Sequence, residues 1–328
     1  MHGQNRPSIP VPPRSSILIA RELPTPVVVK ALRSGEWVRV RRGAYLPAET
    51  VPQVGSSAPQ DQRRMHLARA AAVSAQGRST VTISHDSAAL VLGAFVWRCP
   101  SRVHVTQPTS ASSTRAADII RHKGLLRSDE TTVRAGIQVT SPVRTLVDCL
   151  TTMPALSGLV VADSILALGV DRADGADALA ERGSCNGIRV ARLVLDAADA
   201  GSESPGETHL RFLVWASGLP RPETQVRVST HLGDYWADLG WERWRGLLEY
   251  DGMIKYQAQR DGAPSDALFR EKRRQDAIVE AGYRMVRVTK YDLRSPERII
   301  RRVLALLPPE VATTLTPIRH LLLPTAQR

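Results

Sequence analysis

Three predicted strands follow one another closely in the last third of the 328-residue chain, and they constrain its fold more than any other feature. Their positions are residues 224–230, 235–241 and 246–251. The second and third are apolar runs of the length typical of a strand. The flanking helices, a fourth strand and a last helix are predicted at residues 206–216, 265–281, 283–289 and 295–306. The order α-β-β-β-α-β-α predicts a sheet with helices packed on it, an α/β or α+β sandwich.

Acidic residues interrupt two of the three segments. Asp238 lies in the second and Glu249 and Asp251 in the third, while Glu207 precedes them on the predicted helix. On a strand, Leu247, Glu249 and Asp251 share one face because side chains alternate. Neighbouring carboxylates on a half-buried strand repel each other and are costly to desolvate, and a divalent cation offsets this cost. Because Mg²⁺ is held by one or two carboxylates with waters and substrate phosphates, the pattern indicates a metal-dependent enzyme acting on a phosphodiester.

The expected chemistry gives each carboxylate a role. A Mg²⁺ or Mn²⁺ ion held by Asp238 and Glu249 would polarise the scissile phosphate and lower the pKa of a bound water. For Asp251 three roles stay open: a further ligand, a general base, or a partner that orients Lys255. An Asp251–Gly252 turn is the structural alternative, because Asp-Gly is a common turn pair. This turn accounts for Asp251 but for neither Glu249 nor Asp238.

Charge and composition limit the class of partner and the compartment. The formal net charge of +12 favours a polyanionic partner, most simply nucleic acid, although many basic proteins bind nothing specific. The eight histidines are scattered, and Cys99, Cys149 and Cys185 lack metal-ligand spacing, so we expect a reduced compartment and no zinc site. The longest apolar stretch, residues 156–170, is interrupted by Asp163 and predicts a buried helix. With no signal peptide, we expect a soluble, cytoplasmic protein that does not enter a membrane.

Composition shifts divide the chain into five regions, and the expected fold class is a multidomain α/β protein. The expected regions are a flexible arm at 1–15, a winged-helix domain at 16–50, a middle domain at 61–200, a C-terminal domain at 203–308 and a tail at 309–328. In the second region, helices are predicted at 17–22 and 27–33, the latter closed by Ser34-Gly35. The alternating segment 37–45 predicts a basic hairpin that turns at Arg42-Gly43. A helix followed by such a hairpin is typical of a winged helix-turn-helix.

The middle region is a mixed α/β domain. Its helices are predicted at 63–75, 87–92, 143–150, 156–168 and 188–196, and its strands at 80–84 and 103–106. Ser84, His85 and Asp86 stand side by side, but adjacent side chains point apart, whereas a catalytic triad converges from separate segments. We therefore expect residues 84–87 to cap the following helix instead. Asp148 lies on an apolar helix, where we expect it to be buried in hydrogen bonds.

Residues 203–300 resemble the PD-(D/E)XK, restriction-endonuclease-like superfamily, whose domains have an αβββαβ order, and within it the very-short-patch-repair (Vsr) endonucleases. The resemblance is carried by Ala237-Asp238-Leu239, by Leu248-Glu249-Tyr250-Asp251-Gly252 and by Arg270-Glu271-Lys272-Arg273-Arg274-Gln275-Asp276. It implies that Asp238 is the first metal ligand, that Glu249 is the second acid and that Glu207 is the helix acid. Asp251 stands where the superfamily usually has its catalytic lysine. Lys255, or Lys272 on the next helix, is the expected substitute.

The first two domains resemble AbiEi-type antitoxins of type IV toxin–antitoxin systems. The matching segments are Gly35 to Tyr45, Ile83 to Ala89 and Thr140 to Asp148. The resemblance implies DNA binding by the helix 27–33 and by the hairpin, as in transcriptional autoregulation. The DNA-binding residues expected there are Lys30, Arg33, Arg39, Arg41 and Arg42. A second basic surface, suited to phosphate contacts, is expected from Arg270, Lys272, Arg273 and Arg274.

Two functions of different classes follow from the sequence. In the first, an antitoxin-like half targets DNA and a Mg²⁺-dependent endonuclease domain cuts it. In the second, the chain is a non-catalytic DNA-binding regulator or antitoxin-like protein whose nuclease fold is degenerate. The sequence leaves open whether a toxin-like protein partner exists, and whether the chain forms a homodimer, as winged-helix regulators often do.

Overall fold

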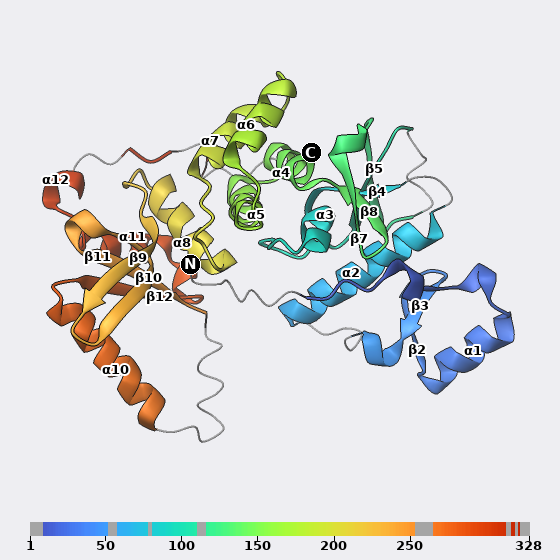
Figure 1. The fold of residues 1–328 in the computed structure, drawn as a ribbon, viewed down its shortest axis with the longest axis horizontal. Helices are drawn as coiled ribbons and strands as arrows, with labels where there is room; N and C mark the ends of the chain where they lie inside the picture. Colours follow the sequence, from blue (N-terminus) through green and yellow to red (C-terminus); the bar gives the residue numbers. More distant parts are fainter. Residues whose placement is uncertain are drawn as a thin grey trace. The chain divides into compact units, whose positions relative to one another are not determined.

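The computed structural model describes residues 9–51, 58–77, 81–109, 116–252, 265–312, 316–318 and 321. The protein is a mixed α/β structure that divides into two compact units, Met1–Ala197 and Ala198–Arg328 (Figure 1). Among the described residues, no helix combines the length and the apolar character needed to cross a membrane. Short 3-10 turns lie at Arg14–Ser16, Ala20–Glu22, Ala48–Thr50, Ser128–Glu130, Glu242–Trp244 and Asp292–Arg294.

The first unit begins with a helix and a small sheet. Helix α1 (Thr25–Ser34) ends at Gly35, whose positive φ of 76° suits glycine, and this confirms the predicted helix. The predicted hairpin is also confirmed, as strands β2 (Trp37–Arg41) and β3 (Ala44–Pro47). The helix predicted at 17–22 is wrong: β1 (Leu18–Ile19) pairs with β3 and is followed by a 3-10 turn. Pairing with a strand that lies far along the chain overrides the local preference of this segment.

A five-stranded sheet follows in the same unit. Helix α2 (Pro59–Gln76) precedes β4 (Thr82–Ile83), α3 (His85–Leu92) and β5 (Val103–Gln107), close to the predicted positions. The strands β6 (Ile119–Lys123), β7 (Thr131–Arg134) and β8 (Ile137–Thr140) were not predicted. The strand order is β6-β5-β4-β8-β7, with β6 parallel to β5 at one edge.

Four helices complete the first unit. They are α4 (Pro142–Thr152), α5 (Ala155–Ala167), α6 (Arg172–Glu181) and α7 (Ile188–Ala197). Ser141 caps α4 by accepting the N–H of Arg144, as its position before Pro142 predicts. Helix α6 was not predicted, because it buries only Gly175 and Leu179 and so lacks a continuous apolar face.

The second unit has the predicted order of helices and strands. Its elements are α8 (Pro205–Ala216), β9 (Glu223–Thr230), β10 (Gly233–Trp241), β11 (Gly246–Asp251), α10 (Ser265–Glu280), β12 (Arg284–Thr289), α11 (Pro296–Leu304) and α12 (Pro309–Ala312). The strand order is β12-β11-β10-β9; β9, β10 and β11 run antiparallel, and β12 is parallel to β11.

Apolar side chains cover both faces of this sheet. On one face, Leu248 packs with Leu210 of α8 and Ile299 of α11. On the other, Leu247 packs with Ile278 of α10. The second unit is therefore a three-layer α/β/α arrangement, and residues of β11 alternate between a face covered by α8 and α11 and a face covered by α10.

Candidate functional site

Strands β10 and β11 separate where their acidic residues lie. Their pairing ends at Leu239 and Leu248, and continuation of this register would set Asp238 opposite Glu249. The N–H of Tyr250 donates to Asp238 Oδ2 at 2.7 Å, so a side-chain oxygen binds this amide in the gap between the strands. Side-chain direction also changes here, because Ala237 packs on the α10 face and Leu239 on the α8 face. We call Asp238 and residues 249–251 the strand fork.

Glu207 lies at the start of α8, next to the strand fork. Its Oε1 accepts from the Ser204 hydroxyl and its Oε2 from the N–H of Glu203, both at 2.8 Å, while Ser204 accepts the Glu207 N–H. Ser204 therefore caps α8, and with the bond from Glu203 to Glu207 two amide groups at the helix start are satisfied. Burial, and then the negative charge of Asp238, raise the pKa of Glu207 to about 7. Glu207 therefore also has a structural role at the start of α8, and the charge of Asp238 makes it harder to ionise.

Helix α8 packs closely on β11 at the fork. A Cβ atom on Gly206 would overlap the ring of Tyr250, so only glycine lets the helix approach this strand without displacing that side chain. Burial, with the charges of Asp251 and Glu207, raises the pKa of Tyr250. Tyr250 thus lies among three acidic groups of the fork region.

Glu249 is held by two arginines on the α10 face. Its Oε1 accepts from Arg274 at 2.7 Å and its Oε2 from Arg287 at 2.9 Å. Glu271 of α10 accepts from both arginines, at 3.1 and 2.5 Å. We call these four residues the Glu249 network; its two carboxylates and two guanidinium groups balance in charge. The predicted face shared by Leu247 and Glu249 is confirmed, because both point toward α10.

The structure brings together only part of the predicted metal site. Asp238 and Glu249 flank the fork and Asp251 ends β11, but Lys255 lies outside the described residues. Among the described residues, the only cluster of three or more His, Cys, Asp or Glu ligand atoms within 4.8 Å of one another consists of histidines. The fork therefore offers carboxylates of the type that Mg²⁺ prefers, with those of Asp238 and Glu249 already engaged in hydrogen bonds.

The predicted DNA-binding residues differ in accessibility. Seven of them are exposed: Lys30, Arg33, Arg39, Arg42, Arg270, Lys272 and Arg273. Arg274 belongs instead to the Glu249 network. Arg41 donates to Asp118 at 2.9 and 3.1 Å and to the Gln76 side chain at 2.7 Å, so it joins the hairpin to the rest of the first unit.

A basic cleft lies beside this hairpin. Its volume is about 1060 Å³, and its charged lining residues are Arg21, Arg41, Arg42, Arg69, Arg102 and Asp118. Asp118 is paired with Arg41, which leaves four arginines around the cleft that have no carboxylate within its lining. A concave surface with this charge suits a phosphate backbone.

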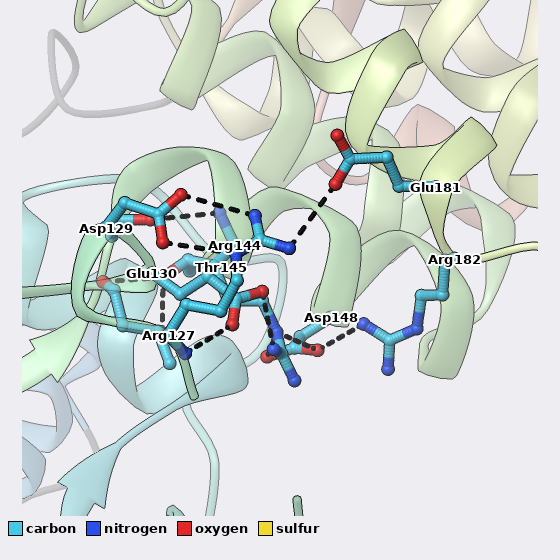
Figure 2. A network of polar contacts seen from close by, with 10 residues as sticks. Arg127, Asp129, Glu130, Arg144, Thr145, Asp148, Glu181 and Arg182 are labelled. Carbon is cyan, nitrogen blue, oxygen red and sulfur yellow. Dashed lines mark hydrogen bonds and ion pairs between the residues drawn. The ribbon is translucent and has the colours of Figure 1, made fainter. Parts of the chain in front are cut away.

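A second arginine network lies inside the first unit (Figure 2). Asp148 of α4 is fully buried; it accepts from Arg144 at 3.0 Å and from Arg182 of α6 at 2.7 Å. Arg144 also donates to Glu130 at 2.9 Å. We call these four residues the Asp148 network. It joins α4 to α6 and to the turn before β7, and it confirms that Asp148 is buried in hydrogen bonds.

Three histidines of the first unit converge, although sequence spacing had indicated no such cluster. His85 begins α3, His104 lies on β5 and His122 lies on β6. His104 Nδ1 and His122 Nε2 are 3.0 Å apart, and the His85 ring stacks on that of His122 with centroids 3.6 Å apart. Burial lowers the pKa of His104 and of His122 to about 4. For His85, burial and then the neighbouring histidines and Arg182 lower the pKa to about 2, so all three rings are uncharged at neutral pH.

The capping role expected for residues 84–87 is wrong. Ser84 precedes α3, but its side chain makes no capping hydrogen bond and instead contacts His85 Nδ1 at 3.0 Å. Ser87 Oγ accepts the N–H of His104 at 3.0 Å and contacts His66 Nε2 at 2.9 Å. These serines therefore orient the histidine region. Sequence spacing missed the cluster because its members come from three separate elements, one of them the unpredicted strand β6.

The protein is thus a mixed α/β chain with a carboxylate-bearing strand fork in one unit and a histidine cluster in the other. No protein-family model matches it. Two curated Mycobacterium tuberculosis proteins, "Uncharacterized protein MT2308" (strain CDC 1551 / Oshkosh) and "Uncharacterized protein Rv2248" (strain ATCC 25618 / H37Rv), are each 30% identical to it over 172 residues. These residues make up 52% of this chain and 61% of each relative, so the chain spans about three fifths of their length.

A solved structure gives a weaker likeness. The crystal structure of RV2827C protein from Mycobacterium tuberculosis is similar with a TM-score of 0.36 and 15% sequence identity. The likeness covers 55% of this chain and 71% of that chain.

Proposed function

We propose that this chain is a DNA-binding protein whose second unit is a Mg²⁺-dependent endonuclease domain of the restriction-endonuclease-like kind. The observation that carries the proposal is the strand fork. Asp238 stands where two antiparallel strands separate, opposite Glu249, and its charge acts on the nearby Glu207. Asp238 and Glu207 come from separate elements, and a buried and a half-buried carboxylate whose charges act on each other are costly to maintain without a cation or a proton.

The donor set at the fork fits a hard divalent cation. Asp238 and Glu249 supply carboxylate oxygens, and Asp251 at the end of β11 is a further candidate. A bound Mg²⁺ or Mn²⁺ would polarise a phosphate and lower the pKa of a water. Glu249 would exchange its hydrogen bonds to Arg274 and Arg287 for the cation. The two arginines would then be available to hold phosphate oxygens, which suits a chain with an aspartate in the place of the usual lysine.

Glu207 is suited to move a proton at this site. Its pKa of about 7 leaves it partly protonated at neutral pH, where a general acid or base is most effective. Its two hydrogen bonds from the helix start hold the carboxyl group in place. We therefore assign Glu207 to proton transfer and Asp238 with Glu249 to cation binding, and Lys255 remains a candidate for stabilising charge.

The first unit is proposed to bring the protein to DNA. The exposed residues Lys30, Arg33, Arg39 and Arg42 lie on α1 and the hairpin. The cleft beside the hairpin is lined by three further arginines, Arg21, Arg69 and Arg102. Phosphate contacts of this kind give affinity and position without reading sequence. The +12 net charge agrees with such a partner.

A specific observation favours a second candidate function. Both oxygens of Glu249 already accept hydrogen bonds from arginines, and Asp251 takes the place of the usual catalytic lysine. Such a network suits a nuclease fold that has lost its cation and is kept for binding. In this alternative, the chain is a non-catalytic DNA-binding regulator or antitoxin-like protein.

Cleavage assays separate the two functions. The purified chain is incubated with supercoiled, single-stranded and mismatched DNA, with Mg²⁺ or Mn²⁺ and with a chelator. The enzyme proposal expects metal-dependent cleavage that Asp238→Asn or Glu249→Gln lowers by about 10³-fold or more. DNA binding should be nearly unchanged in both variants.

A matched control comes from the same strand. Asp234 also lies on β10, but it pairs with Arg227 far from the fork, so Asp234→Asn should cleave like the unmodified chain. Equal cleavage by the Asp238→Asn and unmodified proteins would mean a contaminating nuclease and would remove the proposed site. DNA binding without any cleavage would establish the regulator alternative.

A further inference from the structure

The histidine cluster of the first unit has the donor atoms of a transition-metal site. Each of His85, His104 and His122 offers a ring nitrogen, and the three nitrogens lie within 4.8 Å of one another. His104 Nδ1 and His122 Nε2 are 3.0 Å apart. Bonds of 2.0–2.1 Å at tetrahedral angles would set ligand nitrogens about 3.3 Å apart around zinc. His104 and His122 are thus close to the spacing of two zinc ligands, whereas His85 would have to leave its stack on His122 to reach a common ion.

The remaining ring nitrogens are oriented as in a metal site. His85 Nδ1 is 3.0 Å from Ser84 Oγ, which leaves Nε2 as the nitrogen for an ion. His104 turns Nδ1 toward His122 and Nε2 toward Asp86 Oδ1, at 3.8 Å. A histidine ligand typically donates its second N–H to a carboxylate or another oxygen, and this contact fixes the ring and strengthens the ligand.

Two buried polar atoms near the cluster lack hydrogen-bond partners among the described residues. They are Asp86 Oδ1 and Thr106 Oγ1. Thr106 lies two residues after His104 on β5 and opposite His122 in the register of β5 and β6. Buried polar groups are nearly always satisfied, and an exception calls for an explanation such as an ion with its bound water. Thr106 therefore lies beside His122 of the cluster, and Asp86 Oδ1 lies 3.8 Å from the His104 nitrogen that would not bind the ion.

The backbone of His85 is a further sign of a functional constraint. Its φ is +55°, in the left-handed region, which is uncommon for residues other than glycine, although histidine is among those enriched there. Such a conformation costs on the order of 1 kcal/mol and persists where the surroundings impose it, often at functional sites. Here it occurs at the first residue of α3, whose side chain faces the two histidines of the sheet.

We propose that His85, His104 and His122 bind one zinc ion. Three imidazole nitrogens suit Zn²⁺, whereas Mg²⁺ prefers oxygen ligands, so this site and the strand fork would take different ions. The ion would replace the stacking of His85 on His122 and the contact between His104 and His122. Three protein ligands leave a fourth position, which a water that also reaches Thr106 Oγ1 would fill.

The site would add a cross-link between three elements, of which α3 packs on β5 and β5 pairs with β6. It links the start of α3 to β5 and to β6, the edge strand of the five-stranded sheet. An ion bound only by the folded chain stabilises it by mass action. Zinc should therefore raise the melting temperature of the first unit.

The test uses the full chain without a histidine tag, stripped with a chelator and dialysed. Co²⁺ is added as a spectroscopic probe and then displaced by Zn²⁺. We expect one equivalent of Co²⁺ to give the visible absorption of a four-coordinate site, with zinc displacing it stoichiometrically. His104→Gln and His122→Gln should each remove this spectrum, and Asp86→Asn should weaken zinc binding by about tenfold to a hundredfold while keeping the ligands.

His231→Gln is the matched control, because His231 is exposed in the second unit and pairs with Glu280. It should bind Co²⁺ and Zn²⁺ like the unmodified chain. Circular dichroism of the metal-free variants shows whether each is folded. His122 is on an edge strand and only partly buried, so His122→Gln is used to test the proposal in case His104→Gln does not fold. Absence of stoichiometric zinc binding by the unmodified chain, or equal binding by a folded His122→Gln, would overturn the proposal.

Discussion

Asp148 and Glu249 are each bound by two arginines, one in either unit, and yet their surroundings differ. Asp148 is fully buried among helices, and its arginines complete a closed structural network. Glu249 keeps 11% of its side chain exposed, its arginines are 22% and 34% exposed, and it lies at a break between strands. We therefore expect the Asp148 network to stabilise the fold more than the Glu249 network, whose carboxylate can exchange its arginine partners more easily. The free-energy cost of separating the charges depends on their access to water.

Removing one arginine from each network tests this difference most directly. Arg144→Met leaves the buried Asp148 with Arg182 as its remaining charged partner and should lower the free energy of unfolding by about 3–5 kcal/mol. Arg274→Met leaves the partly buried Glu249 with Arg287 and should cost less, about 1.5–3 kcal/mol. Urea unfolding followed by circular dichroism measures both. Equal losses would mean that the Glu249 network is as structural as the Asp148 network.

Glu207, the acid beside the strand fork, should make the stability of the folded chain depend on pH. The pKa of Glu207 rises from an ordinary 4.5 to about 7 in the folded chain, so the unfolded chain ionises first as the pH increases. The folded state should lose stability between pH 4.5 and 7, by on the order of 3 kcal/mol, and the loss is complete above pH 7. Glu207→Gln should remove this loss and raise the melting temperature at pH 8. A glutamine variant less stable than the unmodified chain at pH 8 would argue against an unfavourable charge here.

The last prediction compares DNA binding by the exposed arginines Arg39 and Arg42 with that of Arg41, which is bound within the first unit. Arg39→Ala with Arg42→Ala should weaken DNA binding by about 1–3 kcal/mol and lower the slope of log affinity against log salt by about 1.8, if each arginine contacts one phosphate. Arg41→Ala should instead mainly lower stability, because Arg41 pairs with Asp118. Fluorescence anisotropy at several salt concentrations measures the slope.

Two exposed arginines on α7, Arg189 and Arg192, provide the matched control for charge. Their replacement by alanine removes the same net charge from the same unit and should leave the salt slope nearly unchanged. An equal change of slope in both double variants would assign the effect to overall charge, and the hairpin would lose its proposed role.

Local patterns predicted the second unit better than the sheet of the first. The segments that became β10 and β11 are apolar and contribute to the cores on both faces of the sheet, which reinforces their local preference. Strand β9 contributes Val226 and Val228 to one of these cores. Strand β7 reads Thr-Thr-Val-Arg and is mostly exposed, and β6 is half-buried with three basic residues. Such short polar strands form because a neighbouring strand supplies their hydrogen bonds, and this information is not in their own sequence.

For the candidate sites, too, local sequence patterns predicted some features and missed others. Asp238 and Glu249 were predictable neighbours because adjacent strands joined by a short turn bring such positions together. Their hydrogen bonds to Tyr250, Arg274 and Arg287 were not predictable, since they depend on where the strands separate and how α10 packs. The histidine cluster had no spacing signal at all.

The amino-acid sequence by itself determined the order of elements in the second unit, the acidic residues of its sheet and the positive charge of the whole chain. These follow from side-chain alternation, helix periodicity and composition, which act over a few residues or over all of them. Only the tertiary structure decided which carboxylates pair with arginines and which three histidines meet. Those contacts join residues that are up to 38 positions apart, and packing of distant elements, not local preference, sets their distances.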